Sequence, residues 1–470
     1  MKNNMEPIPV STESQTGSNH GLIVLLAATI SLFFSAFMAS GINVAIPLIN
    51  EEFQADAILL SWVVTAQLLT IGIFQIPFGR LADIYGIKKI FLWGMILYTL
   101  VTAVAIFSNS IIMIIVCRAL QGIGSAMVFT TGMAMVTAAY PANQRGRVLG
   151  MLTTSVYIGY TAGPFLGGIL TEYLGWRSLF VVNVPAGLLV VFLILWKVKG
   201  EWALSRGEKF DAAGSVICGL ALVALIYGFS LLPDVSGIAA TTAGIIGIVI
   251  FLKWEGRAGS PLLDLKVFRD NRTLLFSNLA TLISYCSTYA LTFLLSLYLQ
   301  YIKALTPEQT GIVLLAQPLM LAVFASFTGR LSDKIEPRVV ASIGMALIFI
   351  GLVFFCFLNR DYPMVLIIIA LLLIGLGMVL FIPPNTNAVM SSITPKYFGI
   401  ASATNSTMRA VGQMLSMGIT TVVMALIIGR VTITPDYYPA FLASVRVSFA
   451  IFSILCIAGI LTSLARGKIR

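Results

Sequence analysis

Long apolar segments, separated only by short polar stretches, recur along the whole 470-residue chain. The segment from Met364 to Ile382, for example, contains no charged side chain. A helix needs about 20 apolar residues to cross the hydrocarbon core of a bilayer, whereas a barrel strand shows about ten alternating ones. The pattern therefore predicts an all-α membrane protein with fourteen spans, which begin near residues 21, 58, 90, 110, 146, 177, 212, 237, 274, 309, 340, 362, 398 and 445.

The composition excludes most soluble functions. Hydrophobic residue types make up 58% of the chain and charged ones only 10%, whereas an ordinary soluble domain carries about 25% charged residues. A water-soluble fold could not bury this much apolar surface, so we exclude soluble enzymes, nucleic-acid-binding proteins and disordered chains. The net charge of +10 is explained by lysines and arginines in cytoplasmic loops, and we expect no nucleic-acid partner.

Histidine and cysteine, the usual ligands and nucleophiles, are scarce or scattered. The one histidine, His20, lies in a polar N-terminal segment. Paired spacing is lacking among the five cysteines, so neither a metal site nor a disulfide framework is indicated. We expect no catalytic residue, no bound metal and no cofactor, and we interpret as small packing residues Cys117, Cys218, Cys286, Cys356 and Cys456.

The positive charges predict the topology. Most of the 29 lysines and arginines fall in alternate loops if the N-terminus lies inside, as the excess of positive charge in cytoplasmic loops requires. With an even number of spans, both termini are then cytoplasmic. We expect residues 1–20 to form a cytoplasmic tail without a cleaved signal peptide, and the chain to be a monomeric, multi-pass protein of the cell membrane.

One loop sequence occurs twice. Gly79-Arg80-Leu-Ala-Asp83 and Gly329-Arg-Leu-Ser-Asp333 share four identities, and each lies between the second and third span of a six-span unit. We therefore predict bundles at 21–197 and 274–470, with two inserted spans and their loops in 198–273. Duplicated bundles place a transport site at their interface. The alternative is a pair of basic loops that only fix topology, but these would need neither the shared glycine nor the shared aspartate.

Local chemistry gives several of these residues a role. Gly79 and Gly86 permit a sharp reversal between two helices, and Asp83 can accept hydrogen bonds at a helix N-terminus or pair with an arginine. Arg118 lies in an apolar segment, so it must face the bundle interior and find partners there, with Gln121 one turn away. The alternative for Arg118 is a purely structural role.

The fifth span carries glycines four residues apart. Gly159, Gly163 and Gly167 share one helix face, which allows another helix to approach closely, and Pro164 removes a hydrogen-bond donor and bends the span. With Pro164 and Gly168 added, we expect this motif to form a sealed, bendable contact between the two bundles. Glycine faces are common in membrane bundles, so the spacing alone is a weak signal.

Taken in order along the chain, these motifs resemble the major facilitator superfamily, specifically its fourteen-span drug:proton antiporter branch. The resemblance implies two six-helix bundles plus two inserted helices, and secondary active export of lipophilic small molecules by proton antiport with alternating access. It also implies a loop that latches the halves (Gly79, Arg80, Asp83, Gly86, Lys88, with Gly329 and Asp333 in the repeat), a coupling pair (Arg118, Gln121) and an antiporter motif (Gly159, Gly163, Pro164, Gly167, Gly168).

The substrate cavity of such a carrier should be mostly apolar with a few polar groups. Aromatic and methionine side chains repack around varied lipophilic molecules. The candidates within the predicted spans are Phe37, Met38, Gln67, Tyr157, Tyr160, Tyr285, Tyr289, Gln317, Asn385 and Arg409.

The sequence departs from the branch in its acidic residues. Met38 stands nine residues before Pro47, where the branch usually carries an aspartate, and Gln67 replaces a frequent tyrosine. All 19 acidic residues fall in tails, loops or span ends. Three possibilities stay open: an acid such as Asp83 titrates, transport is uncoupled, or the substrate is neutral or anionic and attracted by Arg118 or Arg409.

Other functions fit the sequence to different degrees. A carrier of another specificity, for a metabolite, siderophore or lipid and with different or no coupling, would share every motif. A membrane-bound enzyme would need a soluble domain or catalytic groups within the spans. A channel would need a filter loop or a ring of charges.

Overall fold

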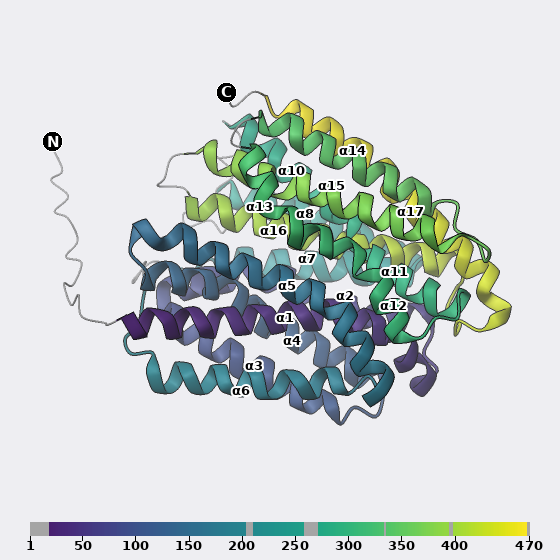
Figure 1. Ribbon diagram of the computed structural model, residues 1–470, viewed down its shortest axis with the longest axis horizontal. Coiled ribbons are helices and arrows are strands. Elements are labelled where there is room, and N and C mark those ends of the chain that lie inside the picture. The colour runs from purple at the N-terminus through teal and green to yellow at the C-terminus, as the bar shows by residue number, and fades with distance from the viewer. Residues whose placement is uncertain (1–17, 204–209, 258–270, 333–334, 394–397, 468–470) are drawn as a thin grey trace.

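The computed structural model describes residues 18–203, 210–257, 271–332, 335–393 and 398–467, and the regular structure in these ranges is helical throughout (Figure 1). Most of the predicted N-terminal tail, residues 1–17, and Asp333 lie outside the described residues. Thirteen helical segments of the described chain are long and apolar enough to cross a membrane. Helix α5 (Ala142–Leu174) has the length of a span as well, but glycine, threonine and tyrosine dilute its apolar character. The all-α membrane fold is confirmed, and fourteen crossings are consistent with it.

Six helices form a first group, whose members pack against one another: α1 lies against α4, α5 and α6, and α4 against α2 and α3. Their bounds are α1 (Ser18–Phe53), α2 (Ala57–Tyr85), α3 (Ile87–Ile106), α4 (Ile111–Ala139), α5 (Ala142–Leu174) and α6 (Ser178–Lys197).

A second group follows residue 271, in which α14 packs on α15 and α17, and α10 on α16 and α17. Its elements are α10 (Arg272–Thr288), α11 (Ala290–Leu297), the π-helical turn η1 (Tyr298–Ile302), α12 (Pro307–Leu314), α13 (Ala316–Ser332), α14 (Pro337–Phe355), α15 (Met364–Ser391), α16 (Phe398–Ile427), the short 3₁₀ turn η3 (Pro435–Tyr437) and α17 (Tyr438–Ala465).

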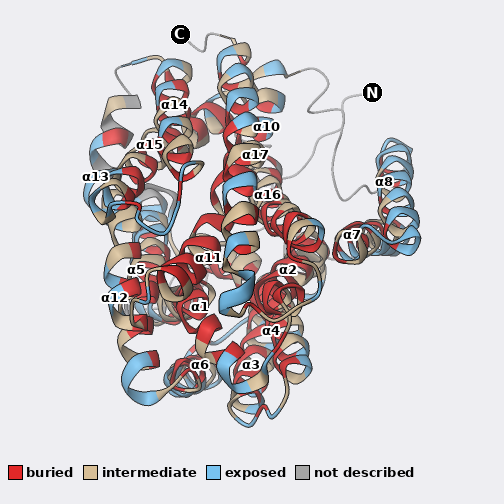
Figure 2. Cartoon of the chain, turned by 90° about the vertical axis from the view of Figure 1, so that its right-hand side faces the viewer, coloured by how far each residue is buried: buried red, intermediate tan, exposed pale blue. Residues whose placement is uncertain are grey.

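Between the groups lie α7 (Ala212–Leu231) and α8 (Val235–Glu255), which pack on each other. Only α7 also contacts the main body strongly, against α2 and α16. Figure 2 shows α8 at the edge of the molecule with mostly exposed residues, the surface expected of a helix that faces lipid. These helices match the predicted inserted pair, whereas the domain limits at 197 and 274 stay a prediction.

The contacts between the two groups follow the sequence repeat. The second span of each group packs against the fifth span of the other, since α2 contacts α16 and α12 contacts α5. In addition, α1 lies against α11. This exchange relates the groups by an approximate two-fold arrangement, as expected for duplicated bundles that enclose a pathway between them.

Two spans that the sequence predicts as continuous helices are each divided into two helices in the structure. The span that begins near residue 274 divides at Tyr289, because the backbone N–H of Ala290 donates to Ser416 Oγ at 3.0 Å. The span that begins near residue 309 divides at Leu315, three residues before Pro318. Proline has no N–H for the carbonyl four residues earlier, so the helical ladder is broken there.

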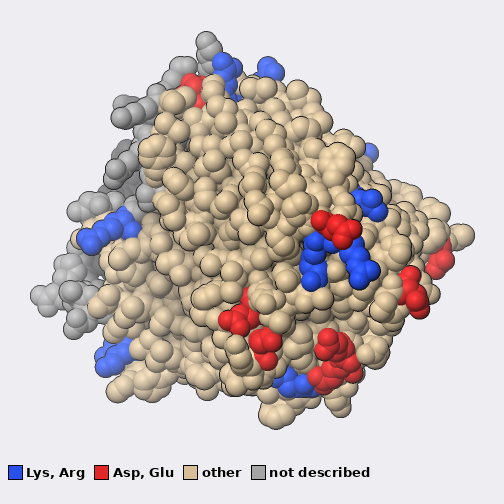
Figure 3. All heavy atoms as spheres, turned by 45° about the vertical axis from the view of Figure 1, so that its right-hand side comes forward, with Lys and Arg blue, Asp and Glu red and all other residues tan. Residues whose placement is uncertain are grey.

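The two ends of the bundle differ in what holds the groups together. We call the end where α1 begins and α17 ends the terminal end, and the end where α1 meets α2 the distal end (Figure 1). Figure 3 shows a broad uncharged surface, with acidic and basic side chains gathered near the distal end. A wide surface without charges between charged ends is typical of a protein embedded in a bilayer.

Candidate functional site

A central cavity lies between the two helix groups and is lined from α1, α4, α5, the α10–α11 junction, α12, α13, α15 and α16. A second cavity adjoins it towards the terminal end and includes Leu149, Met390 and Ser402. Both cavities are lined by Met133, Thr153, Tyr157, Tyr285, Ile382 and Arg409. Because they share these walls, the two cavities adjoin, and together they extend from the middle of the bundle towards the terminal end.

Seven of the ten predicted cavity residues line these two cavities. Tyr157, Tyr160, Tyr285, Tyr289, Gln317 and Arg409 line the central cavity, and Asn385 lines the one towards the terminal end together with Arg409. They come from α5, α13, α15, α16 and the α10–α11 junction. The structure therefore brings together residues that are more than 200 positions apart in sequence.

The other three predicted residues, Phe37, Met38 and Gln67, are not among the lining residues of either cavity. Phe37 packs with the rings of Phe33 and Phe34. The Met38 side chain is fully buried and its sulfur accepts a weak hydrogen bond from Asn183. Gln67 of α2 is buried and donates to Ser125 of α4 at 3.5 Å. Since all three side chains turn towards their own helix group, their predicted role in the cavity finds no support in the geometry.

Several polar lining residues were missed. Ser40 and Asn43 of α1 and Gln413 of α16 all face the central cavity. Gln413 stands four residues after Arg409, and residues at this spacing share a helix face. That spacing, seen beside a candidate arginine, is the signal that would have found it.

Arg409 is the one charged residue among the described residues that line the two cavities. Its guanidinium lies beside the Tyr285 hydroxyl and near Tyr157 and Tyr160. The Gln413 amide lies beside Tyr160. The described site therefore surrounds a single positive charge with neutral hydroxyl and amide groups, which fixes the sign of the ligand charge that it can stabilise.

Arg118 lies apart from the cavity walls, in the interface between α2 and α4. Its side chain is 1% exposed, and it donates from Nε to the Val63 carbonyl oxygen at 3.0 Å and from Nη1 to Gln121 Oε1 at 3.2 Å. Gln121 donates onward to Thr102 at 2.9 Å. A buried arginine with neutral partners facing the bundle interior is the arrangement predicted from the sequence, and its role in coupling stays a prediction.

The glycine face of α5 packs differently from our expectation. A Cβ atom on Gly159 would lie 2.5 Å from the Phe33 carbonyl oxygen, and one on Gly167 would lie 3.1 Å from Gly41. These neighbours belong to α1, so Gly159 and Gly167 seal two helices of the same group, and the predicted contact between the groups is left to the other residues of the motif. The reason is rotational, since residues four apart stay on one helix face and this face points at α1.

The contact between the groups comes from neighbouring residues of the same motif. A Cβ atom on Gly168 would lie 2.6 Å from the Pro307 carbonyl oxygen of α12, and one on Gly311 of α12 would overlap the Pro164 carbonyl. Gly168 is one residue beyond the glycine face and is therefore turned by about 100° from it. Pro164 also lines the central cavity.

The 79–89 segment is only partly the predicted turn. Gly79 lies inside α2, so it does not make the reversal, and our expectation for it is wrong. The chain reverses at Gly86, whose φ of +124° favours glycine. Arg80 and Asp83 lie in the last turns of α2, and the equivalent Gly329 lies inside α13.

An acid that the sequence analysis overlooked caps the following helix. Glu201, in the segment after α6, accepts from the backbone N–H groups of Lys88 at 2.8 Å and Lys89 at 3.0 Å. Lys88 Nζ donates to the Val198 carbonyl oxygen at 2.6 Å. An anion at a helix N-terminus is stabilised by the exposed N–H groups and the helix dipole, so this segment fastens α3 to the end of α6.

Arg466 is buried although it follows directly after the last residue of α17. Its side chain is 1% exposed, and it donates to Asn385 Oδ1 at 2.9 Å and to Ser463 Oγ at 2.6 Å. Asn385 donates to Thr281 at 2.8 Å, which donates to Asn405 at 2.7 Å. This chain of bonds joins the end of α17 to α15, α10 and α16 within the wall of the cavity near the terminal end, since Asn385, Thr281 and Asn405 all line that cavity.

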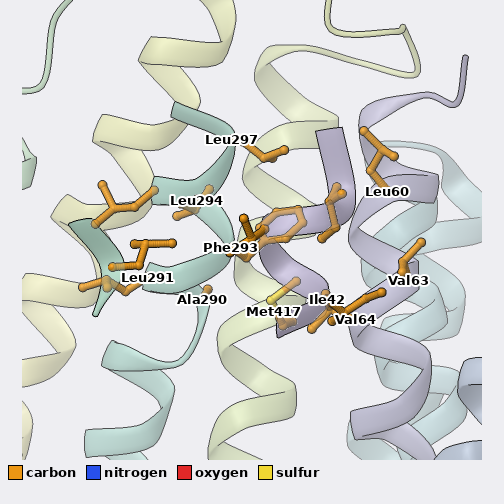
Figure 4. Close-up of a cluster of buried hydrophobic side chains, with 14 of the residues drawn as sticks. Ile42, Leu60, Val63, Val64, Ala290, Leu291, Phe293, Leu294, Leu297 and Met417 are labelled. Atoms are coloured by element: carbon orange, nitrogen blue, oxygen red, sulfur yellow. The ribbon is translucent and has the colours of Figure 1, made fainter. Parts of the chain in front are cut away.

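The distal side of the central cavity is sealed by apolar packing. Figure 4 shows Ile42 of α1 and Leu60, Val63 and Val64 of α2 facing Phe293 and Leu297 of α11, with Met417 of α16 alongside. These side chains are buried. The apolar packing closes the route from the cavity to the distal end.

Hydrogen bonds between the groups reinforce the same end. Ser296 donates to the Asn43 carbonyl oxygen at 2.7 Å, and Gln300 to the Val44 carbonyl oxygen at 2.9 Å. Further bonds between the groups join Asn50 with Tyr301, Ser61 with Thr421, Tyr173 with Glu308, and Ala57 with Val431. All lie at or towards the distal end, so the structure is closed there.

Comparison with known proteins gives one consistent family. The family model described as Major Facilitator Superfamily matches residues 28–417, and a second match covers residues 277–468. The multidrug resistance protein Stp of Mycobacterium tuberculosis (strain CDC 1551 / Oshkosh) is 32% identical over 411 residues, which cover 86% of this chain and 76% of that protein. The riboflavin transporter RibZ of Clostridioides difficile (strain 630) is 29% identical, with 82% and 84% covered.

A similar architecture exists among solved structures. The crystal structure of the peptide transporter POT in complex with sulfate superposes with a TM-score of 0.69 at 13% identity, covering 93% of this chain and 94% of that one. At this identity the likeness concerns the fold alone.

Proposed function

The chain belongs to the major facilitator superfamily, and from this premise we propose that it exports lipophilic small molecules by alternating access, driven by proton antiport. It is a multi-pass membrane transporter and not an enzyme. The observation that carries the proposal is the pair of adjoining cavities between the helix groups, which are sealed at the distal end and extend towards the terminal end. A carrier that works by alternating access must be closed at one end, with its cavity directed towards the other end, in each of its two end states.

The direction of transport follows from the proposed orientation. With both termini in the cytoplasm, the terminal end faces inwards, and the structure corresponds to a state that loads substrate from the cytoplasm. Relatives named for multidrug resistance and for tetracenomycin C resistance and export support efflux of lipophilic compounds from the cell. The lining of tyrosine, methionine and apolar side chains fits such ligands.

Proton coupling would use groups outside the cavity wall. Because the described lining residues include no carboxylate, the proton-binding group would be an acid near a span end, such as Asp83, acting together with Arg118. Reconstitution into sealed vesicles tests this directly. An imposed pH gradient, acidic on the side that receives the substrate, should accelerate export, and flux that is indifferent to the gradient would remove proton antiport.

A second candidate is a carrier for a metabolite with different or no coupling. The similarity to a riboflavin transporter favours it, as does the lack of an acid in the described cavity. Uptake and efflux assays with a panel of lipophilic drugs and aromatic metabolites in the same vesicles would separate the two. We propose in either case that the protein works as a monomer in the cell membrane, with lipid as its other partner.

A further inference from the structure

We propose that the cavity selects anionic planar aromatic compounds and that Arg409 is the residue that determines this selectivity. This inference rests on the proposed function, because it names the substrate class of the same site. It differs from export of organic cations, which would need a carboxylate where this cavity presents a guanidinium.

The first argument is the balance of charge. Among the described lining residues of both cavities, Arg409 carries the one formal charge, and the neutral Tyr285 hydroxyl lies beside its guanidinium. A guanidinium withdrawn from bulk water and paired only with neutral groups loses hydration that no counter-charge replaces. A bound anion supplies that counter-charge, whereas a bound cation would add repulsion.

The second argument is the shape and chemistry of the walls beside this charge. Tyr157 and Tyr160 of α5 and Tyr285 and Tyr289 of the α10–α11 junction all line the central cavity with Arg409. Rings attract other aromatic faces at offset or edge-on geometry. Guanidinium groups bind carboxylate, sulfonate and phosphate oxygens through two parallel N–H donors. An aromatic anion would satisfy both features at once.

The third argument is access. Arg409 lines both the central cavity and the space that continues past Asn385 towards the terminal end. It is half-buried in the cavity wall, so an anion can reach it without any opening of the distal seal. Arg118, by contrast, is enclosed between α2 and α4, and a ligand in the described cavity does not meet it.

Two probes with one ring system test the inference. 1-Anilinonaphthalene-8-sulfonate is an aromatic anion, and N-phenyl-1-naphthylamine is the same skeleton without the sulfonate. Fluorescence titrations would use the full chain in nanodiscs of zwitterionic phosphatidylcholine, with empty nanodiscs subtracted. Arg409→Gln should weaken binding of the anion about tenfold to a hundredfold, since a charge-assisted bond is lost, and should leave binding of the neutral probe within about twofold. Arg409→Lys should recover part of the loss because the charge remains.

The control is an arginine of the same chain far from the cavity. Arg446 is exposed on α17 and donates to the Leu442 carbonyl oxygen of its own helix. Arg446→Gln should bind both probes as the unchanged protein does. Equal affinity of the unchanged protein and Arg409→Gln for the anion, or an equal loss for both probes, would overturn the inference.

Transport assays with the same probes separate this inference from the proposed function. If the anion binds through Arg409 but neither probe crosses the vesicle membrane, the export proposal fails while the selectivity stands. If the neutral probe is exported and the anion is neither bound nor exported, the export proposal stands and the selectivity is wrong. The thermal unfolding of each variant confirms that the compared proteins are folded.

Discussion

Ser296 of α11 donates a hydrogen bond of 2.7 Å to the main-chain carbonyl oxygen of Asn43 in α1. Four residues after Asn43 comes Pro47, inside the same helix. Proline lacks the N–H that would complete the helical ladder, so the Asn43 carbonyl is free to accept from the other helix group. The distal seal thus uses an acceptor that the kink in α1 creates.

Removing this hydrogen bond should favour opening of the distal end. Ser296→Ala leaves the Asn43 carbonyl without its partner from the other group, which costs the closed state about 1 kcal/mol and shifts the opening equilibrium about fivefold. The readout is the rate at which a membrane-impermeant maleimide labels Leu60→Cys, a buried residue of the distal cluster, in a background without the native cysteines.

Ser444→Ala serves as the matched control for this measurement. Ser444 is also fully buried, but its hydroxyl donates to Phe441 of its own helix and joins no other element. The labelling rate should therefore stay unchanged. If both serine variants accelerate labelling equally, the effect is general destabilisation and the seal does not depend on Ser296.

The glycine face of α5 gives a prediction for stability. A Cβ atom on Gly163 would overlap Ser40 and lie 2.9 Å from the Gly41 nitrogen. Gly163→Ala should therefore separate α1 and α5, cost about 1–3 kcal/mol of stability and lower the midpoint of thermal unfolding. Export should fall as well, since Ser40 lines the cavity.

Gly150 offers a control on the same helix. An added Cβ atom there meets nothing within 4 Å. Gly150→Ala should leave transport unchanged and keep or raise the unfolding temperature, because alanine favours the helix by about 1 kcal/mol over glycine. Equal destabilisation by the two substitutions would show that close packing on α1 is not what Gly163 provides.

Substitution of Arg118 should impair export while leaving the affinity of the cavity for its ligand nearly unchanged. Arg118→Ala removes the donors to Val63 and Gln121 and leaves the described cavity walls intact. We expect export to fall at least about tenfold, while the affinity for a fluorescent cavity ligand changes by less than about threefold. A parallel loss of affinity would mean that Arg118 shapes the cavity, and full export would make it a packing residue only.

The sequence predicts those features of the structure that depend on local properties of the chain, such as the apolar length of a segment or a polar residue within it. Apolar length determines whether a helix spans a bilayer, so the helices and their order were predictable. Arg409 and the four tyrosines were found because polar groups in apolar spans are costly and tend to face an interior cavity. The short repeat at Gly79 and Gly329 indicated the two groups, and α2–α16 and α5–α12 packing agrees with it.

Rotation of a helix about its axis was not predictable in the same way. Phe37, Met38 and the glycine face of α5 all turn towards helices of their own group, and no single-sequence pattern says which of two apolar neighbours a face will meet. Glu201 and Arg466 were overlooked for a related reason. Their partners are backbone groups and polar side chains distant in sequence, and only the fold brings them together.

Distance measurements at both ends of the bundle test alternating access most directly. Spin labels at Glu51 and Asp436 report on the distal end, and labels at Arg147 and Ser391 on the terminal end; all four residues are exposed. Double electron–electron resonance in nanodiscs should show two populations for each pair. Ser296→Ala should lengthen the distal distance and shorten the terminal one. A single population for both pairs, or two distances that lengthen together, would contradict a carrier whose helix groups rock about one central cavity.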